Sequence, residues 1–111
     1  MNLSPNALDG PLRVGRSKKK RNSLEIISEM LEAAEHGSRK TSIMYKANLS
    51  YDLLVQYLAV LRENEFLETS DDRMFFPTRK GSKFLKEFRE FRDLYESYEQ
   101  KAQVIRKLFE R

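Results

Sequence analysis

Residues 40–61 read KTSIMYKANLSYDLLVQYLAVL, and this stretch decides the fold because it holds two helical patterns separated by a short break. Three apolar residues give the first, short segment an inner side: Ile43, Met44 and Ala47. The link 48–50 has the length of the turn in a helix-turn-helix motif. Ser50, its last residue, is of a type that caps helix N-termini, so a second helix is expected directly after it.

The second helix of this motif has two contrasting faces. Apolar residues recur every three or four positions on the face expected to pack inward, at Leu54, Tyr57, Leu58 and Leu61. The opposite face carries Tyr51, Asp52, Val55, Gln56 and Ala59. The second helix of a helix-turn-helix motif lies in the major groove of DNA, so this outer face is the expected recognition surface. Four residues are therefore candidates for DNA contact: Ser50, Tyr51, Asp52 and Gln56.

Elements on both sides of the motif complete a larger pattern. Upstream, Asn22 and Glu25 have the spacing of a capping box, and they begin an apolar period that predicts a helix ending near Glu35. Downstream, the β-prone runs 66–69 and 74–77 flank a polar turn and predict a hairpin. We therefore expect a mainly α fold: a winged helix-turn-helix domain over residues 23–82 with the hairpin as its wing.

Residues 83–111 show the most regular pattern in the chain. Apolar residues alternate at spacings of four and three, as in the core seam of a coiled coil, at Phe84, Phe88, Phe91, Tyr95, Tyr98, Ala102, Ile105 and Phe109. A domain this small cannot cover so long a stripe, so we expect a long C-terminal helix that forms a homodimer through the residues from Phe88 to Phe109. Alternatively, the first turns pack onto the winged-helix core. The pattern leaves open whether the pairing is parallel or antiparallel.

The net charge of +4 is unevenly distributed along the 111 residues. Residues 1–23 hold six of the 21 basic residues and one of the 17 acidic residues, so the rest of the chain is nearly neutral. We expect residues 1–22 to be a disordered basic arm, for which a phosphate-binding tether and a simple solvated leader are both open interpretations. Any DNA footprint of the folded part must come from local patches of charge.

Basic residues occur in three segments that a winged helix can bring to one side. Near the first helix of the motif lie Arg39, Lys40 and Lys46, the wing carries Arg73, and Arg79 and Lys80 precede the last helix. In that position they would hold phosphates beside the recognition helix. The alternative is that they are ordinary solvated charges.

The segment 40–51, followed by Tyr57-Leu58 and by residues 78–81 (TRKG), resembles a small archaeal winged-helix DNA-binding family often described as chromatin-associated. The similarity spans roughly residues 23–95. It implies double-stranded DNA as the partner and a C-terminal helix that pairs two subunits in an antiparallel coiled coil.

The chain departs from that family in several places. It has Leu53 and Val55 where members commonly carry polar residues, and Glu65 where they carry a glycine before the wing. Asp71 and Asp72 add acid to the wing tip, and carboxylates repel phosphates. For Asp52, two other roles are open: stabilising its own helix N-terminus, or accepting a hydrogen bond from a cytosine amino group.

These observations favour a dimeric double-stranded DNA-binding protein, either a transcription regulator or a chromatin-like organiser. The alternative is a winged-helix scaffold for protein partners, suggested by Leu53, Val55 and the acidic wing tip. An enzyme is the least expected class, because no nucleophile with a base, carboxylate pair, metal cluster or phosphate loop is recognisable. His36 is the only histidine and Cys is absent, so neither a metal nor a cofactor is expected. With no membrane span or secretory signal in the sequence, the expected location is the cytoplasm, associated with the nucleoid.

Overall fold

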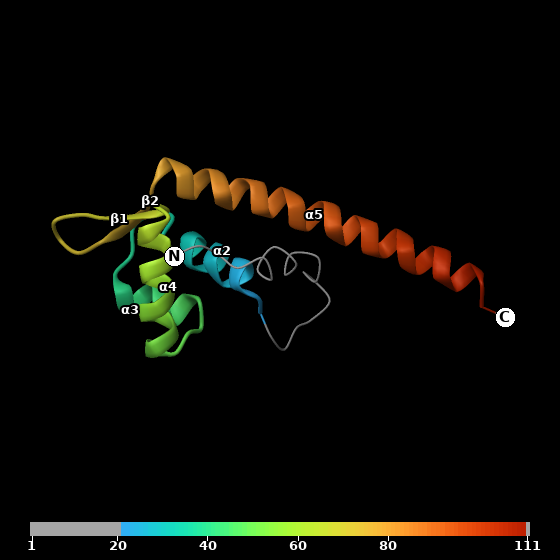
Figure 1. Cartoon of the computed structure of the whole chain (residues 1–111), viewed down its shortest axis with the longest axis horizontal. Helices are drawn as coiled ribbons and strands as arrows, with labels where there is room; N and C mark the ends of the chain where they lie inside the picture. Colours follow the sequence, from blue (N-terminus) through green and yellow to red (C-terminus); the bar gives the residue numbers. More distant parts are fainter. Residues whose placement is uncertain (1–20, 111) are drawn as a thin grey trace.

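The computed structural model describes residues 21–110, and their elements follow the winged-helix order that the sequence predicts (Figure 1). The elements are α2 (Ser23–Ala33), α3 (Lys40–Lys46), α4 (Tyr51–Glu63), β1 (Leu67–Thr69), β2 (Phe75–Pro77) and α5 (Arg79–Leu108). The two strands pair antiparallel with Glu68 opposite Phe76, and they form the predicted wing. The mainly α fold with a small hairpin and a long C-terminal helix is thus confirmed. Most of the expected basic arm lies outside the described residues.

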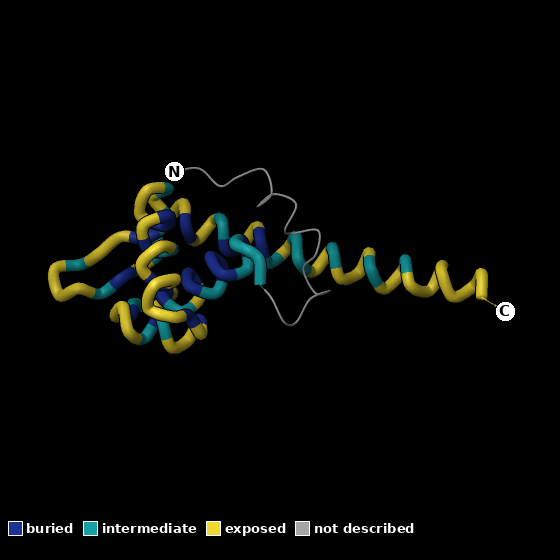
Figure 2. Tube along the Cα trace, turned by 60° about the horizontal axis from the view of Figure 1, so that its bottom comes forward, coloured by how far each residue is buried: buried dark blue, intermediate teal, exposed yellow. Residues whose placement is uncertain are grey.

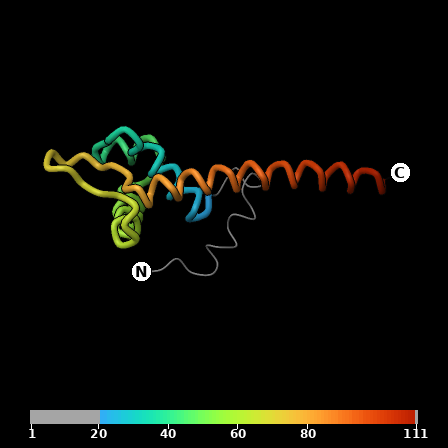
Figure 3. Tube along the Cα trace, turned by 90° about the horizontal axis from the view of Figure 1, so that it is seen from above, coloured from blue at the N-terminus to red at the C-terminus, as the bar shows by residue number. Residues whose placement is uncertain are grey.

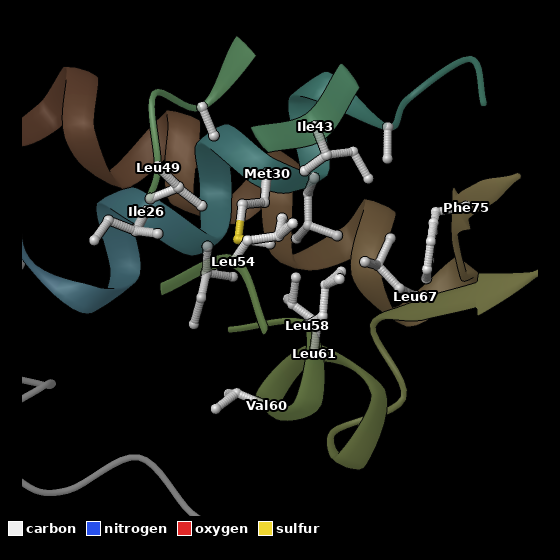
Figure 4. Close-up of a cluster of buried hydrophobic side chains, with 14 of the residues drawn as sticks. Ile26, Met30, Ile43, Leu49, Leu54, Leu58, Val60, Leu61, Leu67 and Phe75 are labelled. Carbon is white, nitrogen blue, oxygen red and sulfur yellow. The ribbon is translucent and has the colours of Figure 1, made fainter. Parts of the chain in front are cut away.

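One apolar core joins α2, α3, α4, the base of the wing and the first turns of α5 (Figure 4). The largest fully buried side chains are Ile27, Met30, Leu31, Ile43, Leu54 and Leu61. Ile43, Leu54 and Leu61 come from the inward faces that the helical spacing predicts, and the other three come from α2. Burying a side chain of this size stabilises the fold by roughly 1.5–3 kcal/mol. The packing of α2 and α3 against α4 therefore fixes where α4 lies.

Helix α2 begins as the sequence predicts and ends slightly earlier. The capping box at its start is complete: the backbone amides of Asn22 and Glu25 each donate to the other's side-chain oxygen at 2.9 Å. The helix ends at Ala33, two residues before the predicted end near Glu35. The chain then turns so that Ser38 exchanges backbone hydrogen bonds with Phe75 of the wing, at 3.1 and 2.8 Å. This added bridge attaches the wing to the segment between α2 and α3.

Helices α3 and α4 are each followed by a residue whose backbone is in the left-handed helical region. Asn48 (φ 54°) follows α3 and Glu65 (φ 61°) follows α4. In each case the next amide reaches back to the last turn: Leu49 N donates to Met44 O at 3.0 Å, and Phe66 N donates to Leu61 O at 2.7 Å. Asparagine tolerates this conformation well, whereas glutamate does not. Position 65, where the resembled family carries glycine, therefore has a backbone conformation that favours glycine.

Thr78 and Gly81 hold the start of α5 against the loop after α4. The Thr78 hydroxyl accepts from the amide of Gly81 at 3.0 Å and donates to the carbonyl of Glu65 at 2.6 Å. Gly81 packs so closely that a Cβ there would lie 2.2 Å from the carbonyl oxygen of Phe66. The helix begins at Arg79, within the span expected for the winged domain, so the domain and the long helix share residues 79–82.

Only the first part of α5 packs on the core, and the rest extends beyond it (Figure 2). Leu85 and Phe88 are buried, and Tyr95 is partly buried against the core. Six large apolar residues of α5 and its C-cap are more than half exposed: Leu94, Tyr98, Val104, Ile105, Leu108 and the C-cap Phe109. The wing and this free part of α5 project from opposite sides of the helical core (Figures 1 and 3).

Candidate nucleic-acid interface

The outer face of α4 is exposed as the sequence predicts. Tyr51, Asp52, Val55, Gln56 and Ala59 all face solvent, while Leu54, Leu58 and Leu61 are buried beneath them. Ser50 is also exposed, but its hydroxyl is engaged as the cap of α4, where it accepts from the amide of Leu53 at 3.2 Å. Asp52 lies in the first turn of this helix, where its carboxylate interacts favourably with the positive end of the helix dipole.

A basic groove lies between the wing, the start of α3 and the last turn of α4. It has a volume of about 410 Å³ and is lined by Arg39, Lys40, Thr41, Arg62, Thr69, Arg73 and Phe75. The ammonium of Lys40 lies 5.3 Å from the centre of the Tyr51 ring, so the basic groove adjoins the outer face of α4. Four cations and two hydroxyls in a cavity of this size suit an oxyanion such as a phosphate group.

The turn of the wing determines where Arg73 lies. Ser70 N donates to Met74 O at 2.8 Å, and Arg73 N donates to Ser70 O at 3.0 Å. Arg73 itself has a φ of 66°, which lets the chain reverse within four residues. The same turn brings the carbonyl oxygen of Asp72 to 3.4 Å from an Arg39 guanidinium nitrogen.

The Asp72 carboxylate interacts electrostatically with Arg39 of the basic groove. A hydrogen bond from the Ser70 hydroxyl, assisted by the Arg39 guanidinium, lowers the pKa of Asp72 from its ordinary value. The side chain is therefore ionised at neutral pH and competes for Arg39 with any bound anion.

Three of the six cations predicted from the sequence converge, and three lie elsewhere. Arg39, Lys40 and Arg73 line the basic groove. Lys46 lies in the last turn of α3, and Arg79 and Lys80 occupy the first turn of α5. The ammonium of Lys80 lies 5.5 Å from the centre of the Phe66 ring. The sequence shows three basic segments but does not show which of them line the same groove.

Sequence reasoning missed Arg62 as a member of this site. It lies eleven residues after Tyr51 on α4, a spacing close to three helical turns, which brings it to the same flank. Extending the helical period to the end of α4 would have found it.

Arg21 also has a structural role that the sequence did not predict. Its guanidinium donates to the carbonyls of Ala47 at 2.6 Å and Asn48 at 2.9 Å, and it forms an ion pair with Glu29. The residue that was counted with the basic arm thus connects α2 to the turn between α3 and α4.

The other flank of α4 borders an apolar cleft. This cleft, of about 340 Å³, is lined by Ser23, Leu53, Gln56, Tyr57, Ala59, Val60 and Glu63. The Tyr57 hydroxyl donates to the Ser23 hydroxyl at 3.1 Å, and this hydrogen bond links α4 to the start of α2. The recognition surface therefore has a cationic flank beside the wing and an apolar flank beside the start of α2.

Two further findings concern residues 21–110. Their His, Asp and Glu side chains form no group of three placed to hold a metal ion. Every helix in this part of the chain is too short or too polar to cross a lipid bilayer.

Comparisons with known proteins agree with this architecture. The crystal structure of Sso10a-2, a DNA-binding protein from Sulfolobus solfataricus, superposes with a TM-score of 0.74 at 24% identity, covering 82% of this chain and 99% of that one. An uncharacterized protein of Methanocaldococcus jannaschii is 37% identical over 69 residues, which are 61% of this chain; they span about a third of that relative's length. A family model described as winged helix-turn-helix matches residues 20–96. The family resemblance of residues 40–51 is thus confirmed, and the chain belongs to the winged helix-turn-helix family.

Proposed function

We propose that the protein binds double-stranded DNA as a homodimer, with α4 in the major groove and the cations of the basic groove on phosphates of the adjacent strand. The observation that carries this proposal is the convergence of Arg39, Lys40, Arg62 and Arg73 beside the exposed face of α4. They come from three separate segments of a nearly neutral domain, so their grouping is a property of the fold. The similar fold of a DNA-binding protein from Sulfolobus supports the same partner.

In the proposed complex, the residues that position the protein on the DNA backbone are different from those that contact bases. Cations lie on the wing flank, where a DNA backbone passes when α4 occupies the groove. Asp52 lies on the outer face and points at bases rather than phosphates, so its charge is tolerated there. If all four cations neutralise phosphates, the logarithm of the affinity falls with the logarithm of salt concentration with a slope of about −3.6 per subunit.

The free part of α5 is the proposed dimer surface. Phe88 is only 5% exposed, because it packs in the core of its own subunit, so the interface rests on the seam from Phe91 onward. In that part Tyr98, Ile105 and Phe109 are 66%, 56% and 85% exposed. Apolar side chains in a continuous row are rarely left in water. The family resemblance favours antiparallel pairing, which would hold two recognition helices apart and suit either a two-site regulator or a DNA-bridging organiser.

Titration of a fluorescent duplex with the full-length protein at several salt concentrations tests the DNA proposal. Arg62→Ala and Arg73→Ala should each weaken binding and reduce the salt slope by about 1. The matched control is Lys86→Ala, which removes one charge from an exposed residue on α5 far from the groove. If the dimer does not bind duplex DNA at low salt, the proposal is wrong; the apolar cleft then favours the protein-scaffold alternative.

Sedimentation tests the dimer proposal. Tyr98→Asp combined with Ile105→Asp should yield folded monomer, because both side chains are exposed in the isolated subunit and their loss leaves its core intact. Ser97→Asp with Gln103→Asp adds the same charge to the same helix outside the seam and should remain dimeric. A wild-type chain that sediments as a monomer would refute this part of the proposal.

A further inference from the structure

The outer face of α4 has an unusual composition for a surface placed against DNA. Asp52, Val55, Gln56 and Ala59 follow the spacing of i, i+3, i+4 and i+7, so they form one line along the helix. Val55 is 44% exposed, and the neighbouring Leu53 is 39% exposed. This line contains two apolar side chains, one amide and one carboxylate, and it contains neither Arg nor Lys.

We infer that this line reads A·T base pairs, with Val55 and Ala59 on thymine methyl groups and Gln56 on adenine. The inference rests on the proposed DNA binding and deepens it by naming the DNA that the site prefers. The cations of the basic groove lie on the flank and are engaged with the backbone, so base discrimination falls to these four residues.

The chemistry of the major groove supports this assignment. The C5-methyl of thymine is the only apolar group that base edges present there, whereas guanine presents two acceptors that Arg or Lys most often contacts. An apolar side chain over a G·C pair would cover polar atoms without giving them partners, which is unfavourable. The Gln56 amide matches the donor and acceptor of adenine.

The geometry is mutually consistent. From Asp52 to Ala59 the helix rises about 10 Å at 1.5 Å per residue, which corresponds to about three base pairs. An adenine contacted by Gln56 has its thymine partner in the same pair, within the span of the neighbouring apolar residues. The apolar flank at Leu53 and Val60 continues this surface toward the cleft beside α2.

Base analogues test the inference without changing the phosphate backbone. Full-length protein is titrated with an alternating A·T duplex and with the same duplex carrying deoxyuridine in place of thymidine, which removes only the methyl groups. Each methyl that is contacted should contribute about fourfold to the affinity, so two contacts predict a loss of about fifteenfold. The reciprocal arm replaces cytosine by 5-methylcytosine in a G·C duplex and should recover part of that affinity.

Two variants identify the side chains responsible. Val55→Ala, at an exposed position, should reduce the difference between thymidine and deoxyuridine duplexes from about fifteenfold to about fourfold, because the contact of Ala59 remains. Arg62→Ala is the matched control: it should weaken binding to both duplexes equally, because it contacts the backbone. For the amide, 7-deazaadenine should weaken binding by the wild type but not by Gln56→Ala.

The possible outcomes separate the inference from the proposed function. Tight duplex binding with equal affinity for thymidine and deoxyuridine would overturn the A·T reading and leave DNA binding intact. A methyl effect that persists unchanged in Val55→Ala would also overturn it, since the discrimination would then arise from DNA shape. Absence of binding to every duplex would refute both.

Discussion

Replacing Gly81 with alanine forces a methyl group to within 2.2 Å of the carbonyl oxygen of Phe66, a distance that no packed Cβ adopts. The contact is with backbone, so relief requires α5 to move away from the loop after α4. That movement also lengthens the hydrogen bonds that Thr78 makes to Gly81 and Glu65.

The expected magnitude follows from three opposing contributions. Overpacking costs about 1–3 kcal/mol. Loss of the Thr78 cap adds about 1 kcal/mol. The better helix propensity of alanine returns about 1 kcal/mol. We therefore expect a net destabilisation of roughly 1–3 kcal/mol, which lowers Tm by about 4–8 °C for each kcal/mol in a domain of this size.

Thermal unfolding followed by circular dichroism, on the wild type and Gly81→Ala at equal concentration, measures this effect. The matched control is Ser82→Ala, one residue further along α5 and exposed, which should change stability by less than about 0.5 kcal/mol. A Gly81→Ala protein at least as stable as the wild type would show that α5 is not held against the loop as the structure describes.

Three other predictions concern stability. Glu65→Gly should raise the free energy of unfolding by about 0.5 kcal/mol, because relief of the left-handed strain exceeds the added chain entropy. The urea midpoint should then rise slightly, and a lower midpoint would contradict this. Arg21→Ala should destabilise the fold by about 1 kcal/mol, since the carbonyls of Ala47 and Asn48 lose their hydrogen-bond donor. Amide hydrogen exchange in the α3–α4 turn should become faster, and unchanged exchange would show that Arg21 does not stabilise this turn. Because the pKa of Asp72 is lowered, its contribution to stability relative to Asp72→Ala should be present at pH 5–7 and disappear as the pH falls below 3.8. A difference that grows toward acid pH would show the opposite sign.

The sequence predicts those parts of the fold that local periodicity and capping determine. The capping box at Asn22, the turn ending at Ser50 and the hairpin all follow from side chains within a few residues of one another. Contacts between distant segments were not predictable in this way. The bridge between Ser38 and Phe75 involves a single residue in an irregular segment, which leaves no period to detect.

The candidate site likewise has one part that local sequence patterns predict and one part that depends on contacts between distant segments. The outer face of α4 follows from helical spacing alone, and it is exposed as predicted. The basic groove depends on how the wing folds back toward α3, and only the structure distinguishes Arg73, which lies in it, from Lys80, which does not. The exposed seam beyond Tyr98 was visible as a pattern, but the point at which α5 leaves the core was not.

The junction at Thr78 and Gly81 gives α5 the properties of a ruler. Thr78 and Gly81 set the direction in which α5 leaves the winged domain, and each residue added to α5 shifts its far end by about 1.5 Å and rotates it by about 100°. In the proposed dimer, an insertion of seven residues would preserve the seam and change the separation of the two recognition helices by about 10 Å. Shorter insertions would turn one domain to a different side of the DNA. In that dimer, the separation of the two recognition helices would change in steps of one heptad.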